Sequence, residues 1–196
     1  MPTVARPREF NPDDAVEQAM QAFWSKGYEA TSLSDLTRAM GISRSSFYET
    51  FGSKHGLFLE AIERYRDTTV ERAVAELEGD GPARAAIAGV FGRIVDNAVG
   101  RGDRRGCFVC NCATEVSPHD AQAAARVAAC LGRFEAAFHA AVTRGQRAGE
   151  FAADRDPRAL ARYLTSSLNG LGVMSKARPD RAALDDVIGV ILSALD

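Results

Sequence analysis

Apolar residues recur every three or four positions along most of the chain, which is the spacing of one face of an α-helix. A first helix is predicted to begin after the N-cap Asn11, with Pro12 in its first turn, and to end at Gly27. Further helices are predicted over 54–77, 83–99, 107–116 and 120–148, and two more open at Pro157 and Asp180. The pattern therefore predicts an all-α protein.

Residues 28–58 predict two short helices joined by a tight turn. Ser32 is a suitable N-cap, and Asp35 lies three positions later, where a carboxylate favours the exposed amides of the first turn. Gly41 can adopt the left-handed conformation that ends a helix. The buried face of this helix is predicted to consist of Leu33, Leu36 and Met40.

The second short helix is predicted to start after Ser43 and to stop at Gly52, and Ser53 caps a longer helix from Lys54. Phe47 and Phe51 are four residues apart and are expected to face the core. Two short helices at a tight turn are typical of a helix-turn-helix, which places its second helix in the major groove of DNA.

The other face of the second helix carries groups that suit DNA. An arginine can bind a guanine edge or a phosphate, small hydroxyl residues approach bases closely, and the amides at a helix N-terminus favour a phosphate. The alternative is that these residues are caps and solvated surface. The predicted DNA-binding residues are Thr31, Ser32, Arg38, Ser43, Arg44, Ser45, Ser46, Tyr48, Lys54 and His55.

The charge balance of this region does not support DNA binding by itself. Residues 1–55 contain six Lys or Arg and seven Asp or Glu residues, so the basic footprint of many DNA-binding domains is absent. DNA binding must therefore depend on where the cationic residues lie rather than on the net charge of the region. Arg6 and Arg8 are expected to form an extended arm that reaches a phosphate or the minor groove.

Residues 11–58 closely resemble the DNA-binding domain of TetR/AcrR-family transcriptional regulators. The resemblance implies a homodimeric, all-helical repressor whose C-terminal domain binds a ligand or senses a chemical. It rests on Ala19, Phe23, Gly27, Tyr28, Thr31, Ser32, Leu36, Met40, Gly41, Ile42, Ser43, Phe47, Tyr48, Phe51, Lys54 and Leu57.

Composition and charge are consistent with that class. The chain has 196 residues, a net charge of −2 and 46% hydrophobic residues, as expected for a globular protein that is not a membrane-surface binder. No apolar run is long enough to span a bilayer, and the N-terminus lacks a signal-peptide core, so we expect a cytoplasmic protein. We expect a helix-turn-helix domain over 1–53 and a helical effector-binding and dimerisation domain over 54–196.

The last two predicted helices carry continuous aliphatic stripes. Such a pair can pack against its copy as a four-helix dimer interface, or it can form ordinary intramolecular core. The family resemblance favours the dimer, because two recognition helices about 34–36 Å apart read a palindromic operator. The predicted interface residues are Leu164, Leu168, Leu171, Leu184, Ile188, Ile191 and Leu195.

A second informative segment runs from Arg101 to Cys112. Three arginines precede Cys107, which lies at a predicted helix N-terminus, and both features favour a reactive thiolate. Cys110 shares its helical face. The thiols, Cys130 included, are interpreted as packed hydrophobes, as an electrophile or redox sensor, or as a metal site completed by His119. A single helix cannot direct all three thiols of this segment at one ion, so we predict no metal and no cofactor.

The segment Arg105–Val109, with Asn111 and the turn 117–120, is similar to the NemR-like branch of the family. That resemblance implies a response to electrophiles or oxidants through Cys107. Lys176, the one lysine beyond residue 55, is a candidate to neutralise or trap a modified Cys107 or to hold an anionic ligand; the alternative is a solvated helix end. Cys107, Cys110 and Lys176 are thus the predicted sensor.

The predicted function is sequence-specific DNA binding and repression, with release by a small molecule or by modification of a cysteine. One alternative is a ligand-gated regulator with inert cysteines. Another is a small thiol oxidoreductase that uses Cys107 and Cys110, although the chain lacks the strand pattern of thioredoxin-like folds.

Overall fold

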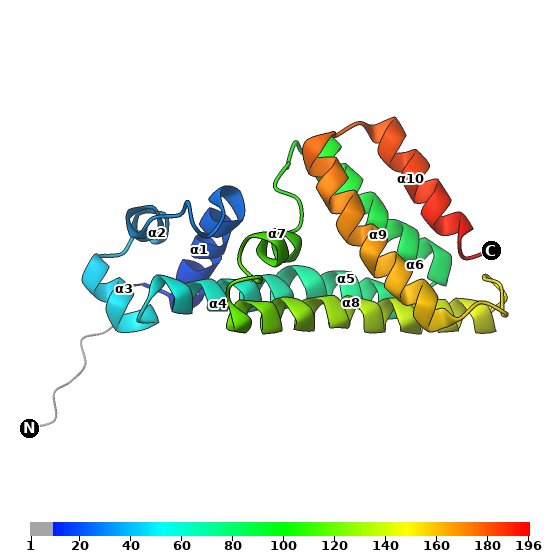
Figure 1. Ribbon diagram of the computed structural model, residues 1–196, viewed down its shortest axis with the longest axis horizontal. Helices are drawn as coiled ribbons and strands as arrows, with labels where there is room; N and C mark the ends of the chain where they lie inside the picture. Colours follow the sequence, from blue (N-terminus) through cyan, green and yellow to red (C-terminus); the bar gives the residue numbers. More distant parts are fainter. Residues whose placement is uncertain (1–9) are drawn as a thin grey trace, which may run out of the picture. The chain divides into compact units, whose positions relative to one another are not determined.

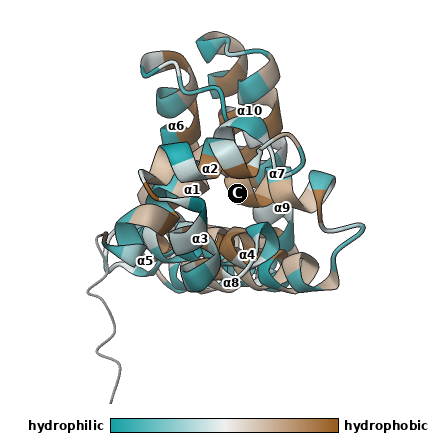
Figure 2. Ribbon diagram, turned by 90° about the vertical axis from the view of Figure 1, so that its left-hand side faces the viewer, coloured by the Kyte–Doolittle hydropathy of each residue, from teal (hydrophilic) through white to brown (hydrophobic). Residues whose placement is uncertain are grey.

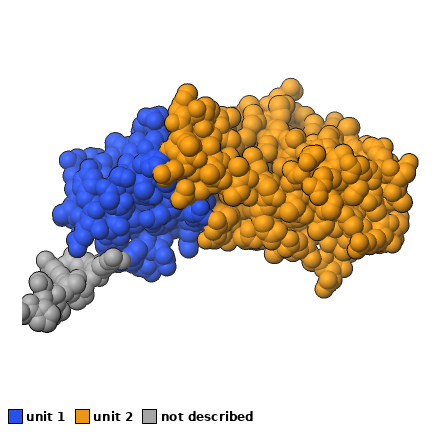
Figure 3. Space-filling view, turned by 60° about the horizontal axis from the view of Figure 1, so that its bottom comes forward, with its two compact units in different colours: residues 1–64 blue, residues 65–196 orange. Residues whose placement is uncertain are grey.

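The computed structural model describes residues 10–196, and every regular element within them is helical, as predicted (Figure 1). The chain forms two compact units, one ending at Arg64 and the other comprising Tyr65–Asp196 (Figure 3). Within the described residues, no helix is both long and apolar enough to cross a membrane. The arm predicted at Arg6 and Arg8 lies outside the described residues.

The N-terminal unit contains α1 (Pro12–Lys26), α2 (Leu33–Met40), α3 (Arg44–Phe51) and most of α4 (Lys54–Tyr65). Its helix ends follow the predicted capping chemistry. The Asn11 side chain accepts a hydrogen bond from the Asp13 amide at 2.9 Å, and Ser53 Oγ accepts one from the Gly56 amide at the start of α4, also at 2.9 Å. Gly27 ends α1 with a positive φ of 86°.

Aromatic side chains form the core of this unit. The rings of Phe23 and Phe58 meet edge to face with centroids 5.2 Å apart, and Tyr28 packs on Phe58 at 4.5 Å. Such ring pairs add stability beyond the area that they bury. Of the predicted α2 core residues, Leu36 is fully buried, whereas Leu33 and Met40 are only half-buried.

The helix predicted over 54–77 is interrupted. α4 passes into a π-helical turn over Arg66–Val70 before α5 (Glu71–Glu78). Tyr65 and Val70 are both buried although they are five residues apart. A regular α-helix would turn them to different sides, and the wider π turn returns both side chains to the core.

The second unit continues with α6 (Ala83–Val95), a π turn (Asp96–Gly100), α7 (Phe108–Glu115), α8 (Ala121–Arg147), α9 (Pro157–Ala177) and α10 (Arg181–Ser193). The long α8 packs against α5, α6, α7 and α9, and α10 covers α6 and α9. Figure 2 shows polar and hydrophobic segments alternating along the helices, as expected when each helix buries one face.

The stripe predicted as a dimer interface is largely core of this unit. Leu164, Leu171, Leu184, Ile191 and Leu195 are at most 3% exposed, Leu168 is 9% exposed, and Ile188 is half-buried. The stripe points inward because α9 packs on α8 and α10 packs on α6. The apolar residues that α9 and α10 leave exposed are different ones: Tyr163, Val173, Met174, Val187 and Val190.

Candidate DNA-binding surface and thiol cluster

The helix α3 is fixed at both ends and along one face. Ser43 Oγ accepts a hydrogen bond from the Ser46 amide at 3.1 Å, and Gly52 follows the last turn with a positive φ of 69°. Phe47 and Phe51 are buried, as predicted. The opposite face is therefore held rigidly toward solvent.

That opposite face carries the predicted contact residues of α3. Arg44 and Ser45 are exposed, and the Tyr48 ring is 55% exposed although it is a large aromatic group. Arg44 Nη2 donates to Ser34 Oγ at 3.0 Å, a neutral partner that leaves the guanidinium charge uncompensated by that contact. An exposed tyrosine beside an exposed arginine is well suited to bind a phosphate backbone.

In the preceding helix, α2, the Asp35 side chain bonds to Ser32 and to Lys26. Ser32 and Asp35 form a reciprocal capping box, with the Asp35 amide 3.1 Å from Ser32 Oγ and the Ser32 amide 3.0 Å from Asp35 Oδ2. Lys26 Nζ lies 2.7 Å from Asp35 Oδ1. The Lys26 and Ser32 hydrogen bonds hold the pKa of Asp35 well below its usual range.

Two acidic side chains of the N-terminal unit form ion pairs. Besides Asp35, Glu17 is paired, with its Oε2 atom 2.9 Å from Nε of Arg64. Arg38 and Arg44 both lie exposed, on α2 and α3. Each of these pairs also uses one cation, and the exposed Glu49 lies on α3 itself, so any attraction to DNA rests on the placement of Arg38 and Arg44 rather than on a local excess of positive charge.

Lys54 and His55 open α4 and are half-buried. Lys54 Nζ lies 4.4 Å from the centroid of the Tyr28 ring and donates to the Glu29 carbonyl oxygen at 3.4 Å. A lysine above an aromatic ring keeps its charge while its position is restricted. It is thereby held at the N-terminus of α4, where backbone amides favour an anion.

Thr31 does not belong to the exposed surface. Its side chain is fully buried, and its hydroxyl donates to the Gly27 carbonyl oxygen. This bond closes the turn between α1 and α2, so we remove Thr31 from the predicted contact set. The other predicted contact residues are exposed (Ser32, Arg38, Ser43, Arg44, Ser45, Tyr48) or half-buried (Ser46, Lys54, His55).

The second predicted site surrounds the N-terminus of α7. Cys107 is its N-cap residue with an extended backbone, φ −90° and ψ 126°. Gly106 has a positive φ of 71°, and a Cβ atom there would lie 3.3 Å from the Gly172 carbonyl oxygen. The missing side chain at Gly106 thus lets this loop approach α9 closely. On the other side, Tyr65 Oη lies 3.9 Å from Cys107 Sγ.

The prediction that arginines lower the Cys107 pKa is wrong. Burial raises the pKa of this thiol, and the Cys110 amide and the Tyr65 hydroxyl offset only part of that effect. The neighbouring cations are engaged elsewhere: Arg105 binds Asp103 at 2.8 Å, and Arg104 donates to the Lys176 carbonyl oxygen at 3.1 Å. Asp103, two residues before Arg105, was the available signal in the sequence.

The other three thiols differ in burial. Cys110 is half-buried, and burial raises its pKa, while the positive charge of Lys176 acts in the opposite direction. Cys112 and Cys130 are buried, and burial raises the pKa of Cys112 far above its usual value. Among the described residues, no group of three Cys, His, Asp or Glu side chains is placed to hold a metal ion.

Lys176 lies beside Cys110 and Asn111. It is exposed near the end of α9, and its Nζ atom donates to Asn111 Oδ1 at 3.4 Å. Its positive charge acts on the Cys110 thiol, where it offsets part of the rise in pKa that burial causes. The electrostatic effect therefore falls on a different cysteine from the one that the sequence suggested.

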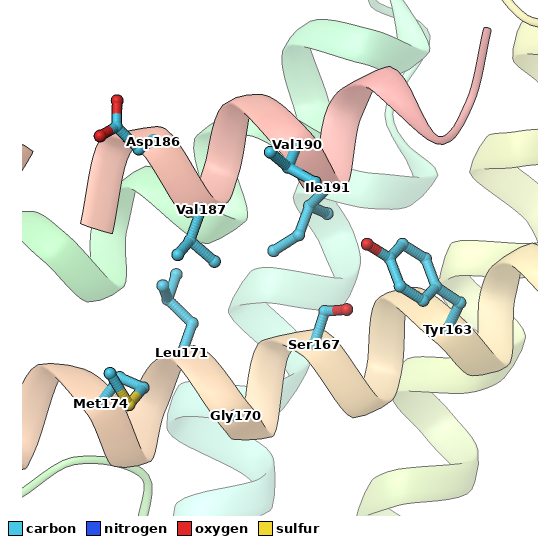
Figure 4. Close-up of a pocket in the computed structure, with 9 residues that line it drawn as sticks. All are labelled: Tyr163, Ser167, Gly170, Leu171, Met174, Asp186, Val187, Val190 and Ile191. Carbon is cyan, nitrogen blue, oxygen red and sulfur yellow. The ribbon is translucent and has the colours of Figure 1, made fainter. Parts of the chain in front are cut away.

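Of the exposed large apolar residues of α9 and α10, all but Val173 line an open groove of about 440 Å³. Leu171 of α9 and Val187 of α10 point toward one another across it, and Tyr163 and Val190 lie further along (Figure 4). Val190 is 66% exposed and Val187 is 42% exposed. Such a contiguous apolar face on a folded domain commonly marks an interaction surface.

Comparison with known families agrees with this architecture. Residues 15–61 match the family model described as bacterial regulatory proteins of the tetR family, and residues 81–191 match the tetracyclin repressor-like C-terminal domain. The chain belongs to the TetR family of transcriptional regulators. The matched N-terminal segment contains the whole helix-turn-helix, α2 and α3.

Individual TetR-family relatives align over nearly their whole length. The HTH-type transcriptional regulator YezE of Bacillus subtilis is 35% identical, covering 98% of this chain and 100% of its own. The HTH-type transcriptional repressor ComR of Escherichia coli is 29% identical over 95% of this chain and 90% of its own. These relatives and the family are transcriptional regulators rather than enzymes.

Solved structures of TetR-family proteins share the fold. A cysteine variant of the regulator CifR, in complex with 26-base-pair operator DNA, superposes with a TM-score of 0.86 and 35% identity, covering 97% of this chain and 100% of that one. Reduced NemR of E. coli superposes with a TM-score of 0.81 at 20% identity, covering 91% of this chain and 95% of that one. At that identity the likeness to NemR is one of fold alone.

Proposed function

We propose that this TetR-family regulator is a repressor that binds palindromic operator DNA as a homodimer and is released by modification of a cysteine. The observation that carries the DNA-binding part is the exposed face of α3, where Arg44, Ser45 and Tyr48 oppose the buried Phe47 and Phe51. The complex of CifR with operator DNA, at 35% identity, supports the same role for this chain.

The proposed contacts divide by chemistry. Arg44 reads a base edge or binds a phosphate, because its guanidinium can make two parallel hydrogen bonds. Tyr48, Lys54 and the hydroxyls at the two helix starts bind the backbone and set the register. The proposed set comprises Ser32, Arg38, Ser43, Arg44, Ser45, Ser46, Tyr48, Lys54 and His55.

The proposed dimer buries the groove between α9 and α10. Its walls include Tyr163, Met174, Val187 and Val190, which are exposed large apolar side chains. The self-complementary solution is a four-helix arrangement in which α9 and α10 of one protomer pack on those of the other. This pairing replaces the inward-facing leucine stripe that the sequence suggested.

The proposed trigger acts through α4. That helix begins at Lys54, immediately after the helix-turn-helix, and ends at Tyr65, whose hydroxyl contacts Cys107. A group added to the Cys107 sulfur would displace the Tyr65 side chain and the end of α4. A shift of α4 changes the spacing of the two recognition helices, and a dimer out of register with its half-sites loses affinity.

A ligand-gated regulator with inert cysteines is the second candidate. The observation that favours it is the burial of Cys112 and Cys130 and the raised pKa of Cys107 and Cys110, since buried thiols react slowly. It differs from the first proposal only in the trigger.

The two candidates are separated by alkylation. Binding to a duplex that the protein selects from a random-sequence library is measured before and after N-ethylmaleimide, in the wild type and in Cys107→Ser. The sensor proposal predicts loss of binding in the wild type and retention in Cys107→Ser. Equal loss in both proteins excludes Cys107 as the switch, and no loss in either favours the ligand-gated regulator.

A further inference from the structure

Cys107 and Cys110 occupy the N-cap and third positions of α7. The same two positions in other helices of this chain hold side chains in direct contact. Ser43 and Ser46 stand in that relationship at α3, and their hydroxyl oxygens are 2.9 Å apart.

The same relationship recurs at α2. The side chains of Ser32 and Asp35 meet there at 2.7 Å. The backbone of Cys107 is extended like that of both serine N-caps. A cysteine is a serine with sulfur in place of oxygen, so the same side-chain rotamer at Cys107 would bring the two thiols of α7 side by side.

We propose that Cys107 and Cys110 form a reversible disulfide, so that the regulator responds to two-electron oxidants of the peroxide class. This inference rests on the proposed sensing function and specifies its chemistry. A Cys-x-x-Cys pair at a helix N-terminus spans the short distance between side chains that a disulfide requires. A thiol reductant cleaves such a disulfide and restores the two thiols.

In this scheme Cys110 reacts with the peroxide first. Cys107 and Cys110 are both half-buried and burial raises the pKa of both thiols, but Lys176, which binds the adjacent Asn111, offsets part of that rise at Cys110. The Cys110 thiolate attacks one peroxide oxygen, the O–O bond breaks, and the leaving oxygen takes up a proton as an alcohol or as water. Cys110 becomes a sulfenic acid.

Cys107 then resolves this intermediate. Its sulfur attacks the Cys110 sulfur, the S–O bond breaks, and the hydroxide that leaves takes the Cys107 proton and departs as water. Two thiols have lost two electrons and two protons, and one peroxide has been reduced. Formation of this bond repositions the Cys107 sulfur and so alters its contact with the Tyr65 hydroxyl at the end of α4.

The remaining cysteines are poor partners for this pair. Cys112 follows Cys110 by two residues, a spacing that places two side chains on different sides of a helix. It is buried against the core together with Cys130 of α8, where an oxidant has little access. Cys112 and Cys130 should therefore remain reduced under conditions that oxidise Cys107 and Cys110.

The test uses the full-length protein treated with hydrogen peroxide and analysed by mass spectrometry after alkylation of the remaining thiols. The decisive variant is Cys112→Ser/Cys130→Ser, which retains only the proposed pair. Relative to the untreated and alkylated sample, we expect this variant and the wild type to carry two fewer alkyl groups and no added oxygen, reversibly with dithiothreitol. Neither Cys107→Ser nor Cys110→Ser should form this intramolecular disulfide. Serine is a favoured N-cap residue, so Cys107→Ser retains the start of α7.

Peroxide adducts without a disulfide in Cys112→Ser/Cys130→Ser would overturn the inference, as would a bond between Cys112 and Cys130 in the wild type. Binding to the selected duplex is measured in the same samples. If the disulfide forms but DNA stays bound, the disulfide inference stands and the proposed sensing function is wrong. If alkylation of Cys107 releases DNA but peroxide forms no disulfide, the sensing function stands and the disulfide inference is wrong.

Discussion

The hydroxyl of Tyr65 lies 3.9 Å from the Sγ atom of Cys107, so the last residue of α4 contacts the residue that caps α7. Both residues belong to the second unit, and Tyr65 is the last residue of α4, which begins at Lys54. It also has an electrostatic sign, because the hydroxyl favours the thiolate of Cys107 and opposes the effect of burial on its pKa.

Replacing Tyr65 with phenylalanine should therefore slow the reaction of Cys107 with iodoacetamide. The variant loses a hydrogen bond to the charged form of the sulfur, so the pKa of Cys107 rises further and the thiolate becomes scarcer. We expect a decrease of about tenfold, the equivalent of one charge-assisted bond of ~1.5 kcal/mol. Tyr163→Phe, which removes an exposed hydroxyl on α9, is the matched control. An unchanged rate in Tyr65→Phe would show that the contact does not control the thiol.

Thiol reactivity should rise steeply with pH. Burial raises the pKa of both Cys107 and Cys110, so alkylation should accelerate by about tenfold per pH unit and level off above the ordinary cysteine value of about 8.5. Peptide mapping of alkylated protein measures each site. A plateau below that value would contradict the raised pKa.

The same shifts affect stability. A raised pKa in the folded state means that the native protein holds the thiol protons more tightly than the unfolded chain does. The contribution of these thiols to stability is complete below about pH 8.5 and is lost as the pH rises through the folded pKa. Urea unfolding of wild type and Cys112→Ser across this range should show a steeper loss in the wild type, because burial raises the Cys112 pKa the furthest.

The groove between α9 and α10 predicts the oligomeric state. Val190→Asp places a charge on its most exposed large apolar side chain and should convert a dimer into a monomer in sedimentation experiments. Operator affinity should fall on the order of a hundredfold, because the two half-sites are no longer held by one particle. Ala140→Asp, on an exposed position of α8, adds the same charge and should leave both properties unchanged.

Two glycines of α8 should respond oppositely to alanine. A Cβ atom at Gly145 would overlap two ring atoms of Phe151, so Gly145→Ala should destabilise the second unit by about 1–3 kcal/mol. Gly132 has no heavy atom within 4 Å of its Cβ position, and alanine there should add up to ~1 kcal/mol through helix propensity. Thermal unfolding measures both, and a neutral Gly145→Ala would contradict the packing described.

The local parts of this fold were predictable because capping is local chemistry. Asn11, Ser32 and Ser43 cap their helices as expected, and Gly41 takes a positive φ of 68°. Each of these features depends on residues within about four positions of one another. The exposed face of α3 therefore followed from the sequence, whereas Thr31 was expected at the surface and its hydroxyl is turned inward by one backbone contact.

The parts that failed depend on packing between distant segments. α9 and α10 have apolar residues on more than one face, and periodicity alone does not reveal which face the monomer buries. Leu164 faces inward while Tyr163, its neighbour in sequence, is exposed. The prediction for the pKa of Cys107 failed for a related reason. Its arginine neighbours are directed to Asp103 and to the end of α9, contacts that only the folded loop reveals.

One titration tests whether α3 reads operator DNA. The affinity of wild type and Arg44→Ala is measured on the palindromic duplex that the protein selects and on a scrambled duplex of equal length. Arg158→Ala, on an exposed position of α9, removes the same charge and is the control. We predict selective binding by the wild type and by Arg158→Ala, and a loss of about 1–3 kcal/mol on the selected duplex in Arg44→Ala. Equal wild-type affinity for both duplexes, or unchanged affinity in Arg44→Ala, would show that Arg44 of α3 does not read operator DNA.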